Sequence, residues 1–175
     1  MGYGSLANPL YRPRCVDKSI DEALSVFGGA LIRGPKYCGK TWSGRNHANS
    51  EVTLMPTEQN PSPLDVFAAA PSLALRGESP HLIDEWQELP LLWDMARSAI
   101  DESGKERKFI LTGSATPRSK KPRHSGVGRI EKLRMRTMSL AESGESNCGV
   151  SLAALLEGEA PSCEAPRMGA DDFAL

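Results

Sequence analysis

The sequence predicts an α/β fold in which helices cover a mostly parallel sheet. Short apolar runs alternate along the chain with segments whose apolar residues recur at the spacing of a helix. Strands that alternate with helices in this way usually run parallel to one another. The first apolar run is also followed directly by a glycine-rich motif and then by a helical segment. That order is typical of α/β proteins that bind a phosphate where the first strand ends.

The apolar runs predict strands at residues 30–32, 51–55, 81–86, 108–112 and 133–140. The first four are short and compact, and the last has the two-residue period of a strand. The third run is apolar where it begins and acidic where it ends. The carboxyl end of this strand is therefore a candidate for chemistry rather than for the core.

The intervening segments predict helices at residues 19–27, 40–49, 64–70 and 90–103, with a short further turn at 152–156. Ser19 and Glu22 have the spacing of a capping box, which predicts that the first helix begins there. Gly28 and Gly104 are expected to end the first and the last of the four long helices. Residues 118–128 are rich in Lys, Arg, Ser, Pro and Gly, and this composition predicts a mobile loop.

The composition is that of one ordinary soluble domain, with 175 residues, of which 39% are hydrophobic and 25% charged. It excludes collagen-like, coiled-coil and disordered proteins. No apolar run approaches the roughly 18 residues that a membrane-spanning helix needs. The first residues also lack the apolar segment of a signal peptide, so we expect a cytoplasmic protein without membrane contact. The four cysteines have neither paired spacing nor the density of a disulfide scaffold, and we expect reduced thiols.

The net charge of −1 conceals an uneven distribution along the chain. Residues 1–103 carry a net charge of −4, residues 104–136 carry +9, and residues 137–175 carry −6. A basic stretch of this density is typical either of a polyanion contact or of a solvated loop. Charge alone leaves both interpretations open.

Residues 34–41 fit the phosphate-binding motif GxxxxGK[ST]. Glycines at both ends let the backbone wrap around phosphates with its N–H groups turned inward. Lys40 is predicted to contact the β- and γ-phosphates, and the hydroxyl of Thr41 is predicted to ligate Mg²⁺. A glycine-rich turn without a ligand is the alternative, which the strand before the motif and the helix after it disfavour. The residues predicted to bind the nucleotide are Gly34, Pro35, Lys36, Tyr37, Cys38, Gly39, Lys40 and Thr41.

The acidic end of the third predicted strand fits the second motif of such a site, Walker B. Asp84 is predicted to hold Mg²⁺ through its water shell. Glu85 is predicted to orient and deprotonate the attacking water. Two adjacent acids also occur at strand ends for solvation alone, so the assignment depends on the phosphate-binding motif beside it.

Three further residues are candidates for the site, each with an alternative interpretation. Thr112 and Ser114 end the fourth predicted strand, where a hydroxyl either reaches the γ-phosphate or attacking water, or caps the next turn. Arg129 follows a glycine-rich segment and is a candidate arginine finger supplied by a neighbouring subunit. A solvated arginine in a basic loop is the alternative for Arg129.

Five segments together resemble the ATPase core of a family of uncharacterised prokaryotic AAA-type ATP-binding proteins. They are Tyr11–Arg14, Gly34–Thr41, Leu82–Gln87, Ile110–Pro117 and Ser125–Ile130, within residues 11–157. The resemblance implies a P-loop NTPase with a mostly parallel five-stranded sheet of order 5-1-4-3-2 and helices on both faces. It implies ATP with Mg²⁺ as cofactors, Lys40 and Thr41 in Walker A, Asp84 and Glu85 in Walker B, and Ser114 near the sensor position.

Members of that family usually continue into a long C-terminal domain that has no counterpart here. We therefore expect an N-terminal extension at residues 1–15 and an AAA-type ATPase core at residues 16–140. Residues 141–175 are expected to be a short, acidic and partly disordered remnant. This organisation predicts a truncated family member.

Three functional hypotheses follow. In the first, the chain is an AAA-type switch or motor core that hydrolyses ATP with Mg²⁺ and contacts a protein partner or a second copy of itself. In the second, the basic residues 105–136 bind nucleic acid and ATP is a modulator. In the third, the chain binds nucleotide without turning it over, because truncation has removed a surface that hydrolysis needs.

Overall fold

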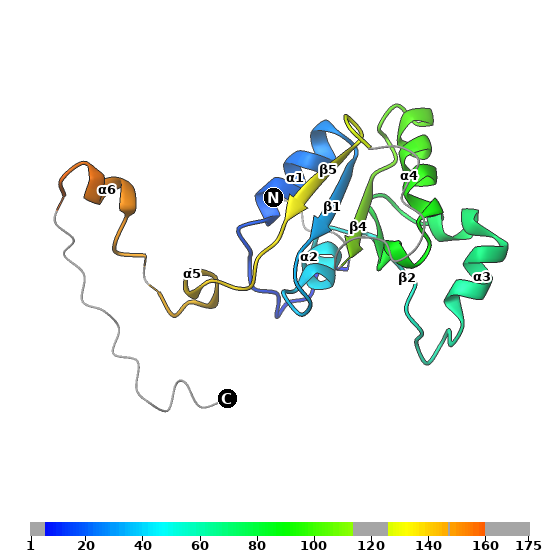
Figure 1. Ribbon diagram of the computed structural model, residues 1–175, viewed down its shortest axis with the longest axis horizontal. Helices are drawn as coiled ribbons and strands as arrows, with labels where there is room; N and C mark the ends of the chain where they lie inside the picture. The colour runs from blue at the N-terminus through cyan, green and yellow to red at the C-terminus, as the bar shows by residue number, and fades with distance from the viewer. Residues whose placement is uncertain (1–5, 114–125, 147, 160–175) are drawn as a thin grey trace. The chain divides into compact units, whose positions relative to one another are not determined.

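The computed structural model describes residues 6–113, 126–146 and 148–159 (Figure 1). The chain divides into two compact units, with the boundary after Thr137. The first unit contains a sheet with helices, and the second contains two short helices, α5 Leu140–Ser143 and α6 Leu152–Leu156.

The first unit is built on a five-stranded sheet in which each pair of neighbouring strands is parallel. Its strands are β1 Gly29–Arg33, β2 Ser50–Thr53, β3 His81–Asp84, β4 Phe109–Gly113 and β5 Ile130–Arg134. Their order across the sheet is β2-β3-β4-β1-β5, which is the predicted order 5-1-4-3-2 counted from the other edge. The predicted fold class, a P-loop NTPase sheet, is confirmed.

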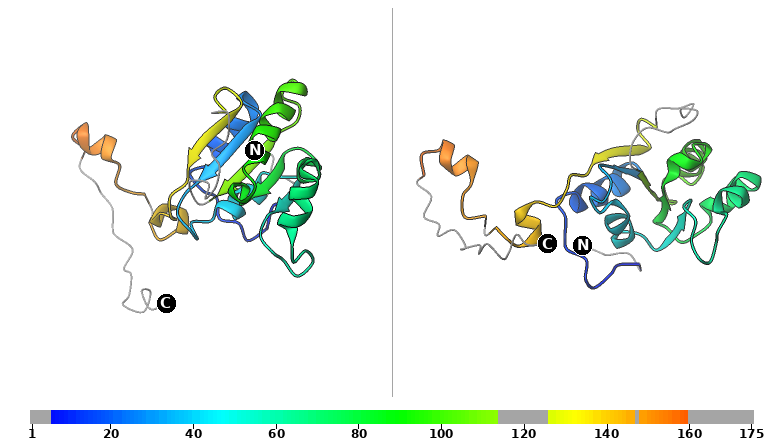
Figure 2. Two further views of the ribbon diagram at one scale, coloured as in Figure 1. Left: turned by 45° about the vertical axis from the view of Figure 1, so that its right-hand side comes forward. Right: turned by 60° about the horizontal axis from the view of Figure 1, so that its bottom comes forward.

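Helices cover both faces of the sheet, as Figure 2 shows from two sides. The helices on one face are α1 Asp17–Val26 and α2 Lys40–Asn46, and those on the other are α3 Pro63–Ala69, η1 Pro71–Leu75 and α4 Leu91–Glu102. Successive strand residues point to opposite faces, so Ala30 and Ile32 of β1 pack with α1 while Leu31 packs with α4. Among the described residues, no helix is both long and apolar enough to cross a membrane.

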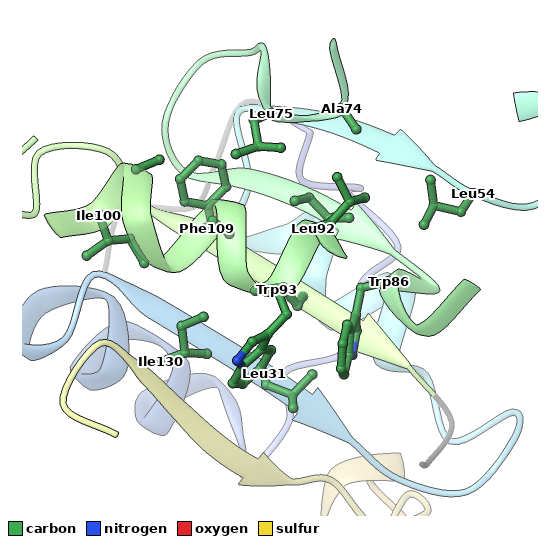
Figure 3. Close-up of a cluster of buried hydrophobic side chains, with 14 of the residues drawn as sticks. Leu31, Leu54, Ala74, Leu75, Trp86, Leu92, Trp93, Ile100, Phe109 and Ile130 are labelled. Carbon is green, nitrogen blue, oxygen red and sulfur yellow. The ribbon is translucent and has the colours of Figure 1, made fainter. Parts of the chain in front are cut away.

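A cluster of buried side chains fixes α4 on its face of the sheet (Figure 3). Trp86 and Trp93 lie at its centre with ring centroids 5.1 Å apart, above Leu31 of β1. Both indole rings are more than nine-tenths buried, so their main role is packing. Trp86 follows the acidic end of β3, and this cluster therefore supports the segment that carries the predicted Walker B residues.

The predicted capping box at Ser19 and Glu22 is wrong. Helix α1 begins two residues earlier, at Asp17, and its N-cap residue Val16 offers no side-chain cap. The physical reason is that the Asp17 carboxylate accepts hydrogen bonds from Tyr11 and from the backbone, so buried tertiary contacts anchor the start of the helix. A capping box does occur at the start of α5, where the Ser139 hydroxyl accepts a hydrogen bond from the backbone N–H of Glu142.

The predicted strand boundaries also differ from the structure, by one or two residues in β1, β2 and β4 and for identifiable physical reasons in β3 and β5. The last strand spans residues 130–134 rather than 133–140, because Ile130 is buried beside Gly29 of β1 and anchors the pairing earlier. A Cβ on Gly29 would lie 2.8 Å from the Ile130 side chain, which shows how closely the two strands approach. The third strand stops at Asp84 because Glu85 adopts a left-handed conformation, with φ of 57°, and the short 3₁₀ helix η2 Trp86–Glu88 follows.

Candidate functional site

The glycine-rich loop connects the end of β1 to the start of α2. Gly34 lies close to the chain that follows β5, and a Cβ on Gly34 would be 2.4 Å from the carbonyl oxygen of Met135. Tyr37 and Gly39 both have left-handed backbone conformations, with φ of 64° and 97°. The loop thus needs a glycine at Gly34 for space and favours one at Gly39 for conformation.

Lys40 is buried, and its side chain folds back across the loop. Its Nζ donates a hydrogen bond of 2.9 Å to the carbonyl oxygen of Pro35. The amine is therefore held against the loop backbone rather than extended into solvent. A cation held at this point can exchange the carbonyl for a phosphate oxygen without leaving the loop.

The carboxyl ends of three strands bring Thr41, Asp84 and Thr112 together. Asp84 of β3 is in register with Thr112 of β4, and Thr112 is in register with Ile32 of β1. The Thr41 hydroxyl donates to Asp84 Oδ1 over 2.9 Å, and the fully buried Thr112 hydroxyl donates to the same oxygen. Asp84 is thus oriented by two hydroxyl groups from two different elements.

Thr41 and Asp84 present the hard oxygen ligands that Mg²⁺ prefers. In residues 6–113, 126–146 and 148–159, no three His, Cys, Asp or Glu side chains cluster in a way that could hold a metal ion. A divalent cation at this site would therefore take its remaining ligands from phosphate oxygens and water, as Mg²⁺ in nucleotide sites commonly does. The donor set fits the predicted ion.

Glu85 is held in place by its backbone and by a neighbour. Its left-handed conformation turns it out of the line of β3. The buried Gln87 side chain donates a hydrogen bond from Nε2 to Glu85 Oε2. The Gln87 side chain also packs on Gly113 at the end of β4. A Cβ on Gly113 would lie 2.2 Å from Gln87 Oε1. Sequence reasoning did not single out Gln87 as a functional residue.

Behind the loop, a polar network joins the N-terminal segment to α1 and α2. His47 follows α2 and contacts Asp17 over 3.3 Å and Asp21 over 2.8 Å. Burial acts to lower the pKa of His47, but the hydrogen bonds and charges of Asp17 and Asp21 outweigh it and raise the pKa above its usual value. Burial and the hydrogen bond to Asp17 likewise raise the pKa of Tyr11.

Asp17 is the centre of this network. Burial acts to raise its pKa, but hydrogen bonds from His47, from the N–H of Arg14 and from Tyr11 outweigh burial and hold the pKa below its usual value. Tyr11 and Arg14 belong to the first of the five segments that carry the family resemblance. That resemblance was their only signal in the sequence.

Two predicted residues remain, Ser114 and Arg129, and the structure describes only the second. Ser114 lies outside the described residues. Arg129 precedes Ile130, which pairs with Gly29 at the start of β1, whereas the glycine-rich loop follows the end of β1. Its Nε donates to Asp101 Oδ1 of α4. Arg129 therefore lies near the amino ends of β1 and β5, away from the loop, and a role as an arginine finger would require the site of another subunit.

The basic stretch 105–136 falls partly outside the described residues, as does the loop predicted at 118–128. Several of its described basic side chains contact the chain itself. Lys105 donates to the carbonyl oxygen of Val26 over 2.7 Å, and Arg107 donates to that of Leu75. These contacts favour a structural role for this part of the stretch, and nucleic-acid binding stays a prediction.

Comparisons with known proteins agree with this geometry. A family model described as an AAA domain matches residues 28–144. Uncharacterised proteins of Mycobacterium tuberculosis and Mycobacterium bovis are each 30% identical to the chain over 128 residues. The aligned part is 71% of this chain and 29% of each mycobacterial protein, so the chain spans less than a third of the length of these relatives.

Proposed function

Because the chain belongs to the AAA domain family of P-loop ATPase-like proteins, we propose that it binds ATP with Mg²⁺ and hydrolyses the γ-phosphate. The family supports nucleotide binding. Hydrolysis, the ion and the roles of individual residues are our proposal, and the geometry of the site supports them.

The observation that carries the proposal is the 2.9 Å hydrogen bond between the Thr41 hydroxyl and Asp84 Oδ1. It joins the loop after β1 to the end of β3 across the intervening strand β4. A Mg²⁺ ligand pair needs this meeting of a hydroxyl and a carboxylate at the phosphate end of the loop. A glycine-rich turn without a ligand does not require Asp84 at that position.

In this proposal the backbone N–H groups of residues 34–41 bind the phosphates, and Lys40 exchanges its hydrogen bond to Pro35 for the β- and γ-phosphate oxygens. Thr41 and Asp84 would hold Mg²⁺, which would offset the charge of the phosphates. Glu85 orients the attacking water and accepts its proton. Ser114 is proposed as the sensor hydroxyl, and Arg129 as a group supplied to another subunit.

A thermal-shift titration with ATP, in the presence and absence of Mg²⁺, tests the binding step. We expect Lys40→Ala to abolish the shift, because it removes the cation that contacts the phosphates. Lys18→Ala is the matched control, since Lys18 lies exposed on α1 and pairs with Glu22. A wild-type chain whose melting temperature does not respond to ATP would refute the proposal at its first step.

Phosphate release measured under saturating ATP tests the hydrolytic step. We expect Glu85→Gln to retain the thermal shift and to lose turnover by roughly 10²- to 10⁴-fold, the usual contribution of a general base. If the wild type binds ATP without releasing phosphate, the chain is a nucleotide-binding module and not an ATPase. Native mass measurement with and without Mg²⁺-ATP then shows whether nucleotide drives self-association.

A further inference from the structure

The segment Tyr11–Arg14 is held by hydrogen bonds to helix α1 and to helix α2, which follows the glycine-rich loop. The Tyr11 hydroxyl donates to Asp17 Oδ1 over 2.6 Å and also contacts Ser43 Oγ of α2 over 2.9 Å. The backbone N–H of Arg14 donates to Asp17 Oδ2 over 2.8 Å, and the N–H of Asp17 donates to the Arg14 carbonyl over 3.0 Å. These contacts fix the position from which the Arg14 side chain extends.

The guanidinium of Arg14 joins two stretches of main chain that are far apart in the sequence. Nη1 donates to the carbonyl oxygen of Cys38 over 2.8 Å, and Nη2 donates to that of Arg136 over 3.0 Å. The first carbonyl belongs to the glycine-rich loop, and the second follows β5. Arg14 is only 8% exposed, and a Cβ on Gly39 would lie 3.0 Å from Nη1, so the side chain fits closely against the loop.

This contact constrains the direction of one loop peptide. In a trans peptide unit, the C=O of one residue and the N–H of the next point in opposite directions. Because Arg14 holds the Cys38 carbonyl toward itself, the N–H of Gly39 points away from Arg14. If the peptide flipped, the carbonyl would replace this N–H on the other side of the loop and would repel a phosphate there.

We propose that Arg14 is a positioning residue that fixes the Cys38–Gly39 peptide in the orientation in which the loop binds phosphate. This inference rests on the proposed function. It also assigns a specific role to the fork of the guanidinium, since one planar group reaches the carbonyls of Cys38 and Arg136 at once. A lysine at this position keeps the charge but has no such fork.

The first experiment measures amide hydrogen exchange of residues 36–41 in the nucleotide-free chain. We expect Arg14→Ala to speed exchange of these amides at least tenfold, because a charge-assisted hydrogen bond that restrains the loop is lost. Arg12→Ala, an exposed arginine in the same segment, is the control and should leave their exchange unchanged. Unchanged loop exchange in Arg14→Ala overturns the inference, whether or not the wild type binds nucleotide.

The second experiment measures ADP affinity. We expect Arg14→Ala to weaken binding by about 10- to 100-fold, Arg14→Lys to weaken it less, and added methylguanidinium to restore part of the affinity of Arg14→Ala. Leu24→Ala in the core of α1 serves as a variant with lowered stability and an intact loop. Equal affinity in Arg14→Ala and Arg12→Ala, or an equal loss in Leu24→Ala, overturns the inference.

These outcomes separate the inference from the proposed function. A wild-type chain that does not bind ADP or ATP refutes the proposed function, while the exchange experiment still decides whether Arg14 restrains the loop. If Arg14→Ala does not fold, Arg14→Lys carries both measurements. Loop exchange and ADP affinity equal to the wild type in Arg14→Lys would then overturn the role of the guanidinium fork.

Discussion

The side-chain amide of Gln87 donates a hydrogen bond to the carboxylate of Glu85. Gln87 is itself 7% exposed and packs on Gly113, the last residue of β4. Among the described residues, its amide oxygen finds no hydrogen-bond donor. The position of the proposed general base is therefore coupled, through one buried amide, to the end of the strand that precedes Ser114.

We expect Gln87→Leu to lower ATP turnover by roughly tenfold while leaving nucleotide affinity within about twofold of the wild type. Leucine has a similar size but cannot orient the Glu85 carboxylate, so part of the roughly 10²- to 10⁴-fold contribution of a general base is lost. Steady-state phosphate release and nucleotide titration give kcat and affinity separately. Gln59→Leu, at an exposed glutamine, is the control. Loss of affinity without loss of kcat would contradict this role.

We expect Gly34→Ala to abolish nucleotide binding and to lower the melting temperature by roughly 2–10 °C. Its Cβ would lie 2.4 Å from the Met135 carbonyl oxygen, and because that atom is backbone it cannot move aside without shifting the chain. Gly104→Ala separates the two effects, since Gly104 has φ of 60° with no atom within 4 Å of an added Cβ. That variant should lose about 1–2 kcal/mol of stability and keep its affinity.

The pH dependence of folding should report the contacts of His47 with Asp17 and Asp21. These contacts raise the pKa of His47 in the folded chain above its unfolded value of about 6.5. The stabilisation is therefore fully present below about pH 6.5 and is lost as pH rises through the folded pKa. We expect the difference in unfolding free energy between the wild type and His47→Gln to shrink as the pH increases from about 6 to about 9.

Urea unfolding at several pH values measures this difference. His81 acts in the opposite direction, because burial lowers its pKa, but it is present in both proteins and its effect cancels in the comparison. A difference that stays constant across this range would show that His47 contributes by packing alone.

The parts of the site that sequence could predict are those whose geometry is local. The loop motif at residues 34–41 fixes its own backbone path, and Asp84 is located by the apolar strand that it ends. The order of the strands was implied by the family resemblance rather than by the residues. The structure then confirms that order.

The parts that sequence could not predict depend on residues that only the fold brings together. Arg14 lies beside Cys38 and Arg136, which are 24 and 122 residues away along the chain. The start of β5 follows from the burial of Ile130 beside Gly29, which no local pattern shows. The spacing of Ser19 and Glu22 also occurs inside a helix, so a capping box predicted from spacing alone was wrong.

Substitution of Arg129 tests whether one copy of the chain contributes a residue to the ATP site of another copy. Arg129 and its partner Asp101 of α4 lie near the start of β1, whereas the glycine-rich loop follows the end of β1, so Arg129 can act as a finger only in the site of a second copy. We expect Arg129→Ala to lower turnover by at least 10³-fold, the lower end of the contribution of an arginine finger. The effect on stability should be small, since partly exposed ion pairs contribute about 0–1 kcal/mol.

Mixing two inactive variants distinguishes this role from a structural one. In an equal mixture of Glu85→Gln and Arg129→Ala, random association places an intact Arg129 against an intact Glu85 in roughly a quarter of the interfaces. Turnover should therefore reappear to about that fraction of the wild type. Arg97→Ala is the control, because Arg97 also contacts Asp101, over 3.2 Å, and should keep turnover. No recovery in the mixture, or full turnover in Arg129→Ala alone, would confine Arg129 to its pair with Asp101.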